Sequence, residues 1–235
     1  MHSDKKPGSL IKVLSLMIVA TGVTVILVYI FTRSAHLAVI IGCAEVTIKL
    51  ILFYIYDKFF KKKCYTPFVL WFTGLSGAGK STIADKVYDY LKIKDISVER
   101  IDGDSVRSIF PQTGFTREDR NTHIRRIGYL ASILEKNGII VLASFVSPYN
   151  ESRNFVRSLC VNFIEVYVNA PLNKCEERDV KGLYAKARKG EINNFTGISD
   201  PFEIPENPEI TLNTDKESIE ESCNKIINYV QRYLG

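Results

Sequence analysis

Residues 74–81 of this 235-residue chain read GLSGAGKS, that is Gly74, four further residues, and then Gly79, Lys80 and Ser81. This spacing fits the phosphate-binding pattern G-x-x-x-x-G-K-[ST]. An apolar run at 68–72 precedes the loop and predicts a buried strand, and the residues after it predict a helix. We therefore expect a strand–loop–helix unit that binds phosphate. A chance glycine-rich turn is the alternative, and it does not account for both flanks.

The loop also predicts which ligands it holds. Its glycines allow tight turns that point backbone N–H groups at an anion, and the helix N-terminus adds a positive dipole end. Lys80 is expected to reach the β- and γ-phosphates, and the Ser81 hydroxyl to bind Mg²⁺. The expected cofactors are therefore ATP and Mg²⁺, with ATP held by the run Gly74, Leu75, Ser76, Gly77, Ala78, Gly79, Lys80, Ser81 and Thr82.

Downstream of the loop, apolar runs that predict strands alternate with helical patterns. Further strands are expected at 98–101, 139–146, 162–168 and near 210–212, and helices at 80–93, 116–137, 150–159 and about 216–233. This alternation is typical of an α/β fold with a mainly parallel sheet between helices, here a P-loop kinase fold. Ligands of such sheets bind beyond the carboxyl ends of the strands.

Two carboxylates, Asp102 and Asp104, follow the predicted strand 98–101 with a glycine between them. Beside a phosphate loop they suit Mg²⁺ positioning and acceptance of a proton from a substrate hydroxyl, although an Asp-Gly turn alone is common. Arg107 follows one helical turn later and could reach an anionic substrate. The strand 139–146 ends without the Asp that a P-loop hydrolase would place there. This absence favours a kinase whose metal is held with help from Asp102 and Asp104, with Asp104 and Ser81 as the expected ligands.

Two further segments carry clusters of ionisable or aromatic residues. The helix after Gly114 begins with a capping pattern, Thr116 with Asp119, and its first turns hold several Arg side chains and His123. These side chains suit recognition of phosphate or sulfate, or simply form a solvated helix face. Residues 176–203 mix basic residues, glycines and aromatics with weak periodicity. This composition suits a mobile lid over the site, or a surface loop without a catalytic part.

The N-terminal part of the chain has a different composition. Residues 13–32 contain no charge, and a second apolar run covers 37–56 after a short polar break. Each run is long enough to cross a bilayer, so 1–63 is expected to form a two-helix transmembrane hairpin, and 64–235 the kinase domain. A signal peptide is disfavoured because the first run is long and no A-x-A site follows. A buried hairpin in a soluble protein would show similar periodicity, but the flanking lysines argue against it.

The charges suggest an orientation for this hairpin. Residues 1–63 hold nine Lys or Arg and three Asp or Glu, a net charge of +6, while the other 172 residues hold 22 and 23, a net charge of −1. Lysines 5, 6, 12, 58 and 61–63 flank the hairpin on one side, and only Arg33 lies in the turn. The positive-inside rule then places both termini and the kinase domain in the cytoplasm, beside the cell membrane. Nucleic acid is not an expected partner.

Glu45 and Lys49 lie four residues apart within the second apolar run. They are interpreted as a mutually neutralising pair on the face where the two helices meet; an intramembrane site for transport or oligomer contact is the alternative. The five cysteines are scattered without a C-x-x-C motif, which fits reduced thiols. The three histidines are far apart, so a histidine-based metal site is not expected.

Taken together, the residues from about 66 to 234 resemble the adenylyl-sulfate kinase family, which phosphorylates the 3′-hydroxyl of adenosine 5′-phosphosulfate (APS) with ATP. Six ordered blocks carry the resemblance: TGLSGAGKST (73–82), DGDSVR (102–107), GFTREDR with IRRIG (114–128), FVSPYNESR (145–153), EVYVNAPLNKCEERDVKGLYAKAR (165–188) and FTGISDPFE (195–203). The N-terminal segment loosely resembles small two-helix membrane proteins of unknown function, through residues 9–12 and through Glu45, Lys49 and Tyr54.

This resemblance implies roles for individual residues. Asp104 would orient or deprotonate the 3′-hydroxyl with support from Asp102, and Arg178 would lie near the ATP base. Ser147 is a phosphoserine in some descriptions of the family; direct in-line transfer, with Ser147 as a substrate contact, is favoured here because no activating base adjoins it. The expected substrate-binding residues are Arg107, Phe115, Arg120, His123, Ser147, Lys181, Phe195 and Ile198, with the two Phe side chains stacking on the substrate adenine.

One position departs from the family pattern. His123 stands where the family commonly has Asn, so we expect activity with altered and pH-sensitive substrate affinity. The family further implies a homodimer. Two other functions remain open at this point: a membrane-bound nucleotide sensor or scaffold without turnover, and a P-loop kinase for another small hydroxyl substrate.

Overall fold

The computed structural model describes residues 8–60, 65–109 and 114–235, and for residues 8–14, 56–60, 104 and 108 it describes the backbone alone. The chain divides into two compact units, residues 1–62 and 63–235. Some predictions fall outside the described part. They concern lysines 5, 6 and 61–63 and the side chains of Lys12, Lys58 and Asp104.

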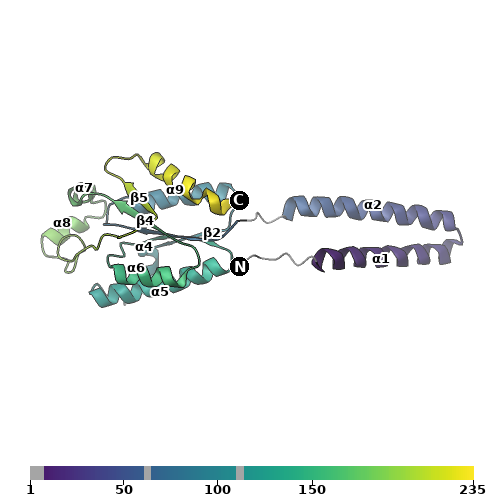
Figure 1. Ribbon diagram of the computed structural model, residues 1–235, viewed down its shortest axis with the longest axis horizontal. Helices are drawn as coiled ribbons and strands as arrows, with labels where there is room; N and C mark the ends of the chain where they lie inside the picture. The colour runs from purple at the N-terminus through teal and green to yellow at the C-terminus, as the bar shows by residue number, and fades with distance from the viewer. Residues whose placement is uncertain (1–7, 61–64, 110–113) are drawn as a thin grey trace. The chain divides into compact units, whose positions relative to one another are not determined.

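The first unit is a hairpin of two long helices, α1 (Gly8–Thr32) and α2 (Ala35–Phe60) (Figure 1). Both are longer than the runs 13–32 and 37–56 predicted from apolar composition, because residues outside an apolar core can still continue a helix. The break between them is two residues, and Arg33 takes a left-handed conformation there (φ 52°). The stretches Ser15–Thr32 and Ala35–Ile55 are long and apolar enough to cross a membrane.

The two helices meet along a stripe of small and polar residues. Ala38 and Gly42 of α2 are buried, and a Cβ atom added at Gly42 would lie 2.6 Å from Val25 Cγ2 on α1. Glu45 and Lys49 follow on the same stripe and form an ion pair, and Lys49 Nζ also donates to Thr21 Oγ1 of α1 at 3.4 Å. The pair therefore lies where the neutralised-pair interpretation expects it, while most of the large apolar side chains of both helices are exposed.

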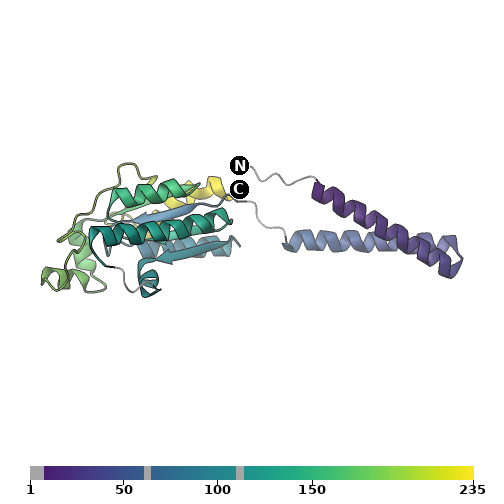
Figure 2. The same ribbon diagram turned by 90° about the horizontal axis from the view of Figure 1, so that it is seen from below.

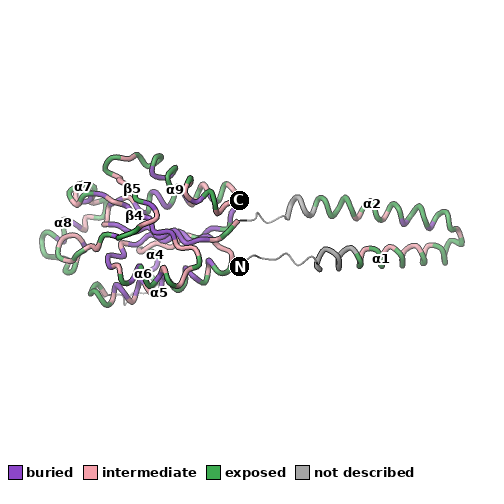
Figure 3. The backbone as a smooth tube through the Cα atoms, in the orientation of Figure 1, coloured by how far each residue is buried: buried purple, intermediate pink, exposed green. Residues whose placement is uncertain are grey.

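The second unit is built on a five-stranded parallel sheet of order β2-β3-β1-β4-β5. The strands are β1 (Val69–Thr73), β2 (Val98–Asp102), β3 (Ile140–Ser144), β4 (Phe163–Asn169) and β5 (Ile210–Asn213). The P-loop strand β1 is central, with Val69 in register with Val141 of β3 and with Phe163 of β4. The predicted parallel α/β sheet is confirmed. Figure 3 shows the middle of the sheet as buried, and β1 and β3 are buried along their whole length.

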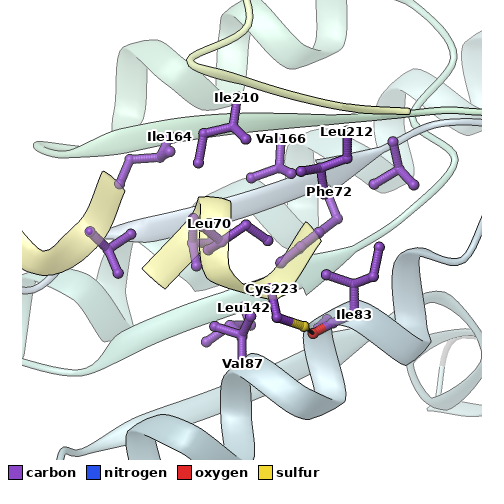
Figure 4. Close-up of a cluster of buried hydrophobic side chains, with 14 of the residues drawn as sticks. Leu70, Phe72, Ile83, Val87, Leu142, Ile164, Val166, Ile210, Leu212 and Cys223 are labelled. Carbon is purple, nitrogen blue, oxygen red and sulfur yellow. Dashed lines mark hydrogen bonds between the residues drawn. The ribbon is translucent and has the colours of Figure 1, made fainter. Parts of the chain in front are cut away.

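Helices cover both faces of this sheet. Helices α3 (Lys80–Ile93) and α9 (Ile219–Leu234) lie on one face, and α5 (Arg117–Lys136) and α6 (Asn150–Leu159) lie on the other (Figures 1 and 2). Because side chains alternate along a strand, β1 serves two cores. Leu70 and Phe72 pack toward α3 and α9 (Figure 4), and Val69 and Trp71 pack toward α5 and α6.

Three short helices were not predicted from the sequence: α4 (Gly103–Ile109), α7 (Leu172–Arg178) and α8 (Leu183–Arg188). Each has six or seven residues, too few to show a helical period above the background of charged and glycine residues. Two of them, α7 and α8, lie partly or wholly within residues 176–203, where a mobile lid or a surface loop was expected. The carboxylate of Asp179 fixes the start of α8, because its two oxygens accept hydrogen bonds from Tyr184 N (3.1 Å) and Ala185 N (3.0 Å). The capping box of Thr116 and Asp119 on α5 is present as predicted.

Candidate active site

A cleft of about 870 Å³ opens at the carboxyl ends of the strands. It is lined by the P-loop, by the ends of β2 and β3, by one side of α5, and by the segments around 178–184 and 192–196. Most of the predicted site residues line it. They are Ser76 to Thr82, Asp102, Arg107, Phe115, Arg120, His123, Ser147, Arg178, Lys181 and Phe195. Three of the described predicted residues do not line it, namely Gly74, Leu75 and Ile198.

The P-loop has the backbone that its glycines allow. Gly74, Gly77 and Gly79 all have positive φ (148°, 73° and 100°), and a Cβ atom at Gly74 would lie 2.4 Å from Val168 O. A side chain at this position is therefore excluded by sterics as well as by the backbone conformation. The Lys80 ammonium is buried and donates to Gly74 O at 2.9 Å and Leu75 O at 2.7 Å. The cation is thus held within the loop that is expected to surround phosphate.

Side chains from elsewhere in the unit hold three consecutive carbonyls of this loop. The Tyr184 hydroxyl donates to Ser76 O (2.9 Å), Arg178 Nη1 to Gly77 O (3.3 Å), and Thr214 Oγ1 to Ala78 O (2.8 Å). Arg178 Nη2 also donates to Thr214 O at 2.7 Å. Arg178 therefore braces the loop, in addition to lining the cleft where the nucleotide base was expected. Sequence reasoning missed Tyr184 and Thr214, because neither belongs to a phosphate-binding motif.

Asp102 ends β2 and caps the helix that follows it. Its carboxylate accepts from Ser105 N and from Ser105 Oγ, both at 3.0 Å, which fixes the first turn of α4. This geometry sets the backbone position of residue 104, whose side chain is not described. Arg107, at the other end of α4, has its guanidinium 4.5 Å from the centre of the Phe115 ring. Asp102 and Arg107 both line the cleft.

Arg120 joins the two loops that border the far side of the cleft. The residue is buried; its Nε donates to Phe115 O at 3.0 Å and its Nη2 to Asn194 O at 2.6 Å. Asp200 Oδ2 lies 4.0 Å from its Nε. Burial lowers the pKa of Arg120, and the nearby Asp200 carboxylate opposes that shift. The side chain that was predicted to meet an anionic substrate is thus also a brace between residues 115 and 194.

Phe115 is half exposed in the cleft, as a ring that stacks on a ligand would be. Phe195, the second predicted stacking residue, also lines the cleft, and its ring lies edge to face against the ring of Tyr184. Lys181 lies between Phe115 and Phe195 in the sequence, and it is exposed and lines the cleft.

His123 is buried on the cleft wall, with 3% of its surface exposed. Burial, with smaller contributions from Arg107 and Arg126, lowers its pKa to about 4. Within the described part of the chain its Nε2 atom has no hydrogen-bond partner. The side chain therefore offers one unpaired, neutral imidazole nitrogen to the cleft. The pH sensitivity expected from this residue would fall well below neutral pH.

Ser147 is buried with a left-handed backbone (φ 37°), which a non-glycine residue rarely adopts. Its Oγ accepts from Trp71 Nε1 at 3.1 Å and donates to Thr73 Oγ1 at 3.0 Å. Arg153 Nη1 donates to Ser147 O at 2.6 Å. The hydroxyl is thus engaged within the protein. The surrounding contacts hold a strained backbone at the cleft.

Ser144 occupies the strand end where a P-loop hydrolase would carry its Asp. It closes β3, which is hydrogen-bonded beside β1, and it lines the cleft. The residue is buried, and among the described residues its hydroxyl has no partner. A buried hydroxyl at this place can hydrogen-bond to a ligand or to a water bound with it. Sequence reasoning noted the missing Asp here but did not select the serine.

The residues near the P-loop fit Mg²⁺ bound largely through nucleotide phosphates. No group of three or more His, Cys, Asp or Glu that could enclose a metal occurs among the described residues. Mg²⁺ with a nucleotide needs only one or two protein ligands. Ser81, exposed in the first turn of α3, and Asp102 at the cleft provide oxygen atoms of the kind this ion prefers.

Comparison with known proteins matches both units of the chain. Residues 66–213 match the family model of adenylylsulphate kinase, and residues 10–60 match a family described as a predicted membrane protein. The adenylyl-sulfate kinase of Halothermothrix orenii is 58% identical over 163 residues, which cover 69% of this chain and 88% of the relative.

Solved structures agree with these matches. The APS kinase CysC of Mycobacterium tuberculosis, in complex with AMPPNP and APS, aligns with a TM-score of 0.68 and 40% identity, covering 71% of this chain and 99% of that one. A hexameric APS kinase from Thiobacillus denitrificans aligns with a TM-score of 0.56 and 27% identity, covering 83% of this chain and 33% of that one.

Proposed function

This chain belongs to the adenylyl-sulfate kinase family, and from that premise we propose that it transfers the γ-phosphoryl group of ATP to the 3′-hydroxyl of APS, giving ADP and 3′-phosphoadenylyl sulfate. The observation that carries this proposal is that one cleft is lined both by a P-loop and by two aromatic side chains, Phe115 and Phe195. A kinase that phosphorylates APS must hold two nucleotides at once, ATP by its phosphates and APS by its base.

The donor side follows from the P-loop. Its backbone would surround the ATP phosphates, and Lys80, now hydrogen-bonded to the loop carbonyls, would turn to the β- and γ-phosphates. Bound Mg²⁺, held by Ser81 and Asp104, would neutralise charge that develops on the transferred group. Arg178 is assigned to the ATP site because it contacts Gly77 and lines the cleft.

The acceptor side follows from the opposite wall. Phe115 and Phe195 would stack on the adenine of APS, while Arg107 and Lys181 would contact its phosphosulfate group. His123 would donate or accept one hydrogen bond through its unpaired Nε2. Arg120 would contribute mainly by holding the 115 and 194 loops in place, and Ile198 by packing under the second loop.

Direct transfer between the two nucleotides is the favoured mechanism. Asp104 would orient the 3′-hydroxyl and accept its proton, with Asp102 fixing the turn that carries it. A phosphoserine at Ser147 is disfavoured, because its hydroxyl is shared between Trp71 and Thr73 and no general base contacts it among the described residues.

The same proposal includes a membrane location and an oligomer. The apolar hairpin would anchor the chain in the bilayer with both termini in the cytoplasm, so that the kinase acts near the inner membrane surface. A homodimer is proposed on the strength of the family, in which a hexameric member has been solved.

The test of the catalytic assignment is the turnover of the Asp104→Asn variant of the full chain in detergent micelles. Loss of the proton acceptor should lower kcat by about 10²–10⁴-fold with a smaller change in the KM for APS. Asp89→Asn, a substitution on the exposed side of α3, serves as the matched control. Unchanged turnover in the Asp104 variant would remove Asp104 from the mechanism.

A further inference from the structure

The acceptor loop, defined here as residues 194–200, is packed directly onto the donor P-loop. Gly197 has a left-handed backbone (φ 95°), and a Cβ atom there would lie 3.1 Å from Leu75 Cδ2 and 3.3 Å from Leu172 Cδ1. Leu75 belongs to the P-loop. Any displacement of the P-loop at Leu75 must therefore be followed by the acceptor loop or leave a gap between them.

Tyr184 makes a second and more specific connection between the same two segments. Its hydroxyl donates to Ser76 O of the P-loop at 2.9 Å. Its ring meets the ring of Phe195 edge to face, with centroids 5.0 Å apart and planes at 80°. Tyr184 is 98% buried, so its hydroxyl cannot move with the Ser76 carbonyl unless its ring also moves against Phe195.

The position of Tyr184 is itself fixed. Asp179 accepts hydrogen bonds from Tyr184 N and Ala185 N and so anchors the start of α8. Arg178, the residue before that aspartate, donates to the carbonyl of Gly77. One short segment thus contacts two successive P-loop carbonyls and one aromatic ring of the acceptor side.

We propose that Tyr184 is a positioning residue that couples the two nucleotide sites, so that occupation of the P-loop by the donor orders Phe195 for the acceptor. The inference rests on the proposed function, since it takes Phe195 to be part of the APS site. Phosphates in the loop fix the direction of the Ser76 carbonyl, this carbonyl fixes the Tyr184 hydroxyl, and the ring then fixes Phe195. By linkage, APS raises the affinity for the donor by the same factor.

The test measures binding and not turnover. Isothermal titration calorimetry on the full chain in micelles gives the Kd for APS with and without saturating AMPPNP and Mg²⁺. The coupling factor is the ratio of the Kd measured without AMPPNP to the Kd measured with it. In the wild-type chain we expect a ratio above about 5. Tyr184→Phe keeps the ring and removes the hydroxyl. The loss of one hydrogen bond should reduce the ratio by about 5-fold while APS binding without AMPPNP changes little.

Tyr65→Phe is the matched control, because the Tyr65 hydroxyl also donates to a backbone carbonyl, that of Gly138 at 2.8 Å, at the opposite end of the sheet. It should leave the ratio unchanged. A thermal melt of each variant separates a loss of coupling from a loss of folding. The proposal is overturned if the wild-type ratio is near 1, if Tyr184→Phe keeps the wild-type ratio, or if both variants lower it equally. A chain that binds both ligands with coupling but forms no product would refute the proposed function and leave the coupling intact.

Discussion

At the residue scale, substitution of Ser147 distinguishes a mechanism with a phosphorylated serine from direct transfer between the nucleotides. Its hydroxyl accepts from Trp71 Nε1 and donates to Thr73 Oγ1 in a buried site. Ser147→Ala should leave the indole N–H unpaired and cost roughly 1–3 kcal/mol of folding stability. The kcat should fall by less than about 10-fold, because a direct transfer does not pass through this oxygen.

Stability is measured by urea unfolding, and kcat by the ATP- and APS-dependent release of ADP. Thr73→Val is the matched control, since it removes the other hydroxyl of the same contact. A loss of about 10³-fold or more in kcat for Ser147→Ala alone would instead identify Ser147 as a nucleophile.

The buried His123 should make the free energy of unfolding depend on pH. Its pKa is lowered from 6.5 to about 4, chiefly by burial, so between these values the unfolded chain binds a proton that the folded chain does not. Stability from this residue is therefore present above pH 6.5 and is lost as the pH falls toward 4. Between pH 7.5 and 4.5 the loss should be about 2–3 kcal/mol. His123→Asn should remove that part of the pH dependence, as urea unfolding at the two pH values would reveal; equal pH dependence in both proteins would refute it.

The residues in motifs were predictable from the sequence, because a motif fixes both residue type and spacing. Lys80, Asp102 and Phe115 line the cleft as expected. Ser144 and Tyr184 were not, since a hydroxyl at a strand end or on a short helix has no spacing signature. Their contacts depend on which strands are neighbours and on how α8 is placed, and both are properties of the whole fold.

At the element scale, the close contact of α5 and α6 holds the wall that carries Arg120 and His123. Gly128 of α5 is buried against α6, and a Cβ atom there would lie 2.3 Å from Val156 Cγ2. Gly128→Ala should destabilise the fold by about 1–3 kcal/mol despite the better helix propensity of Ala. Making room at the partner residue should restore stability.

A double-mutant cycle with Val156→Ala tests this contact by urea unfolding. Each single variant should be destabilised, Val156→Ala by its cavity, and the double variant should be more stable than their sum predicts by about 1 kcal/mol or more. Additive losses would mean that the two helices do not share this contact in solution.

The long elements of the second unit were predicted to within a few residues, because apolar runs and helical periods of ten residues or more are strong signals. The short helices α4, α7 and α8 were missed. Their stability comes from capping and from contacts with the P-loop, as with Asp179 at the start of α8, and not from an apolar stripe. An irregular composition therefore did not mean an irregular backbone.

At the scale of the whole molecule, the proposed transmembrane hairpin predicts on which side of the membrane each part of the chain lies. If both termini are cytoplasmic, the turn between α1 and α2 lies on the other side of the membrane. In intact cells a membrane-impermeant maleimide should label the Ser34→Cys variant above the parent chain, whereas Ser97→Cys, an exposed position in the kinase unit, should be labelled only after permeabilisation. The reverse pattern would invert the proposed orientation, and equal labelling of both would argue against a spanning hairpin.

The most direct measurement of the central claim is the identity of the product that the full chain forms from ATP and APS with Mg²⁺. Mass spectrometry and ³¹P NMR should find 3′-phosphoadenylyl sulfate, one molecule for each ADP, and Lys80→Ala should abolish it. ATP and APS that bind without this product, or another hydroxyl acceptor that is phosphorylated faster than APS, would contradict the account.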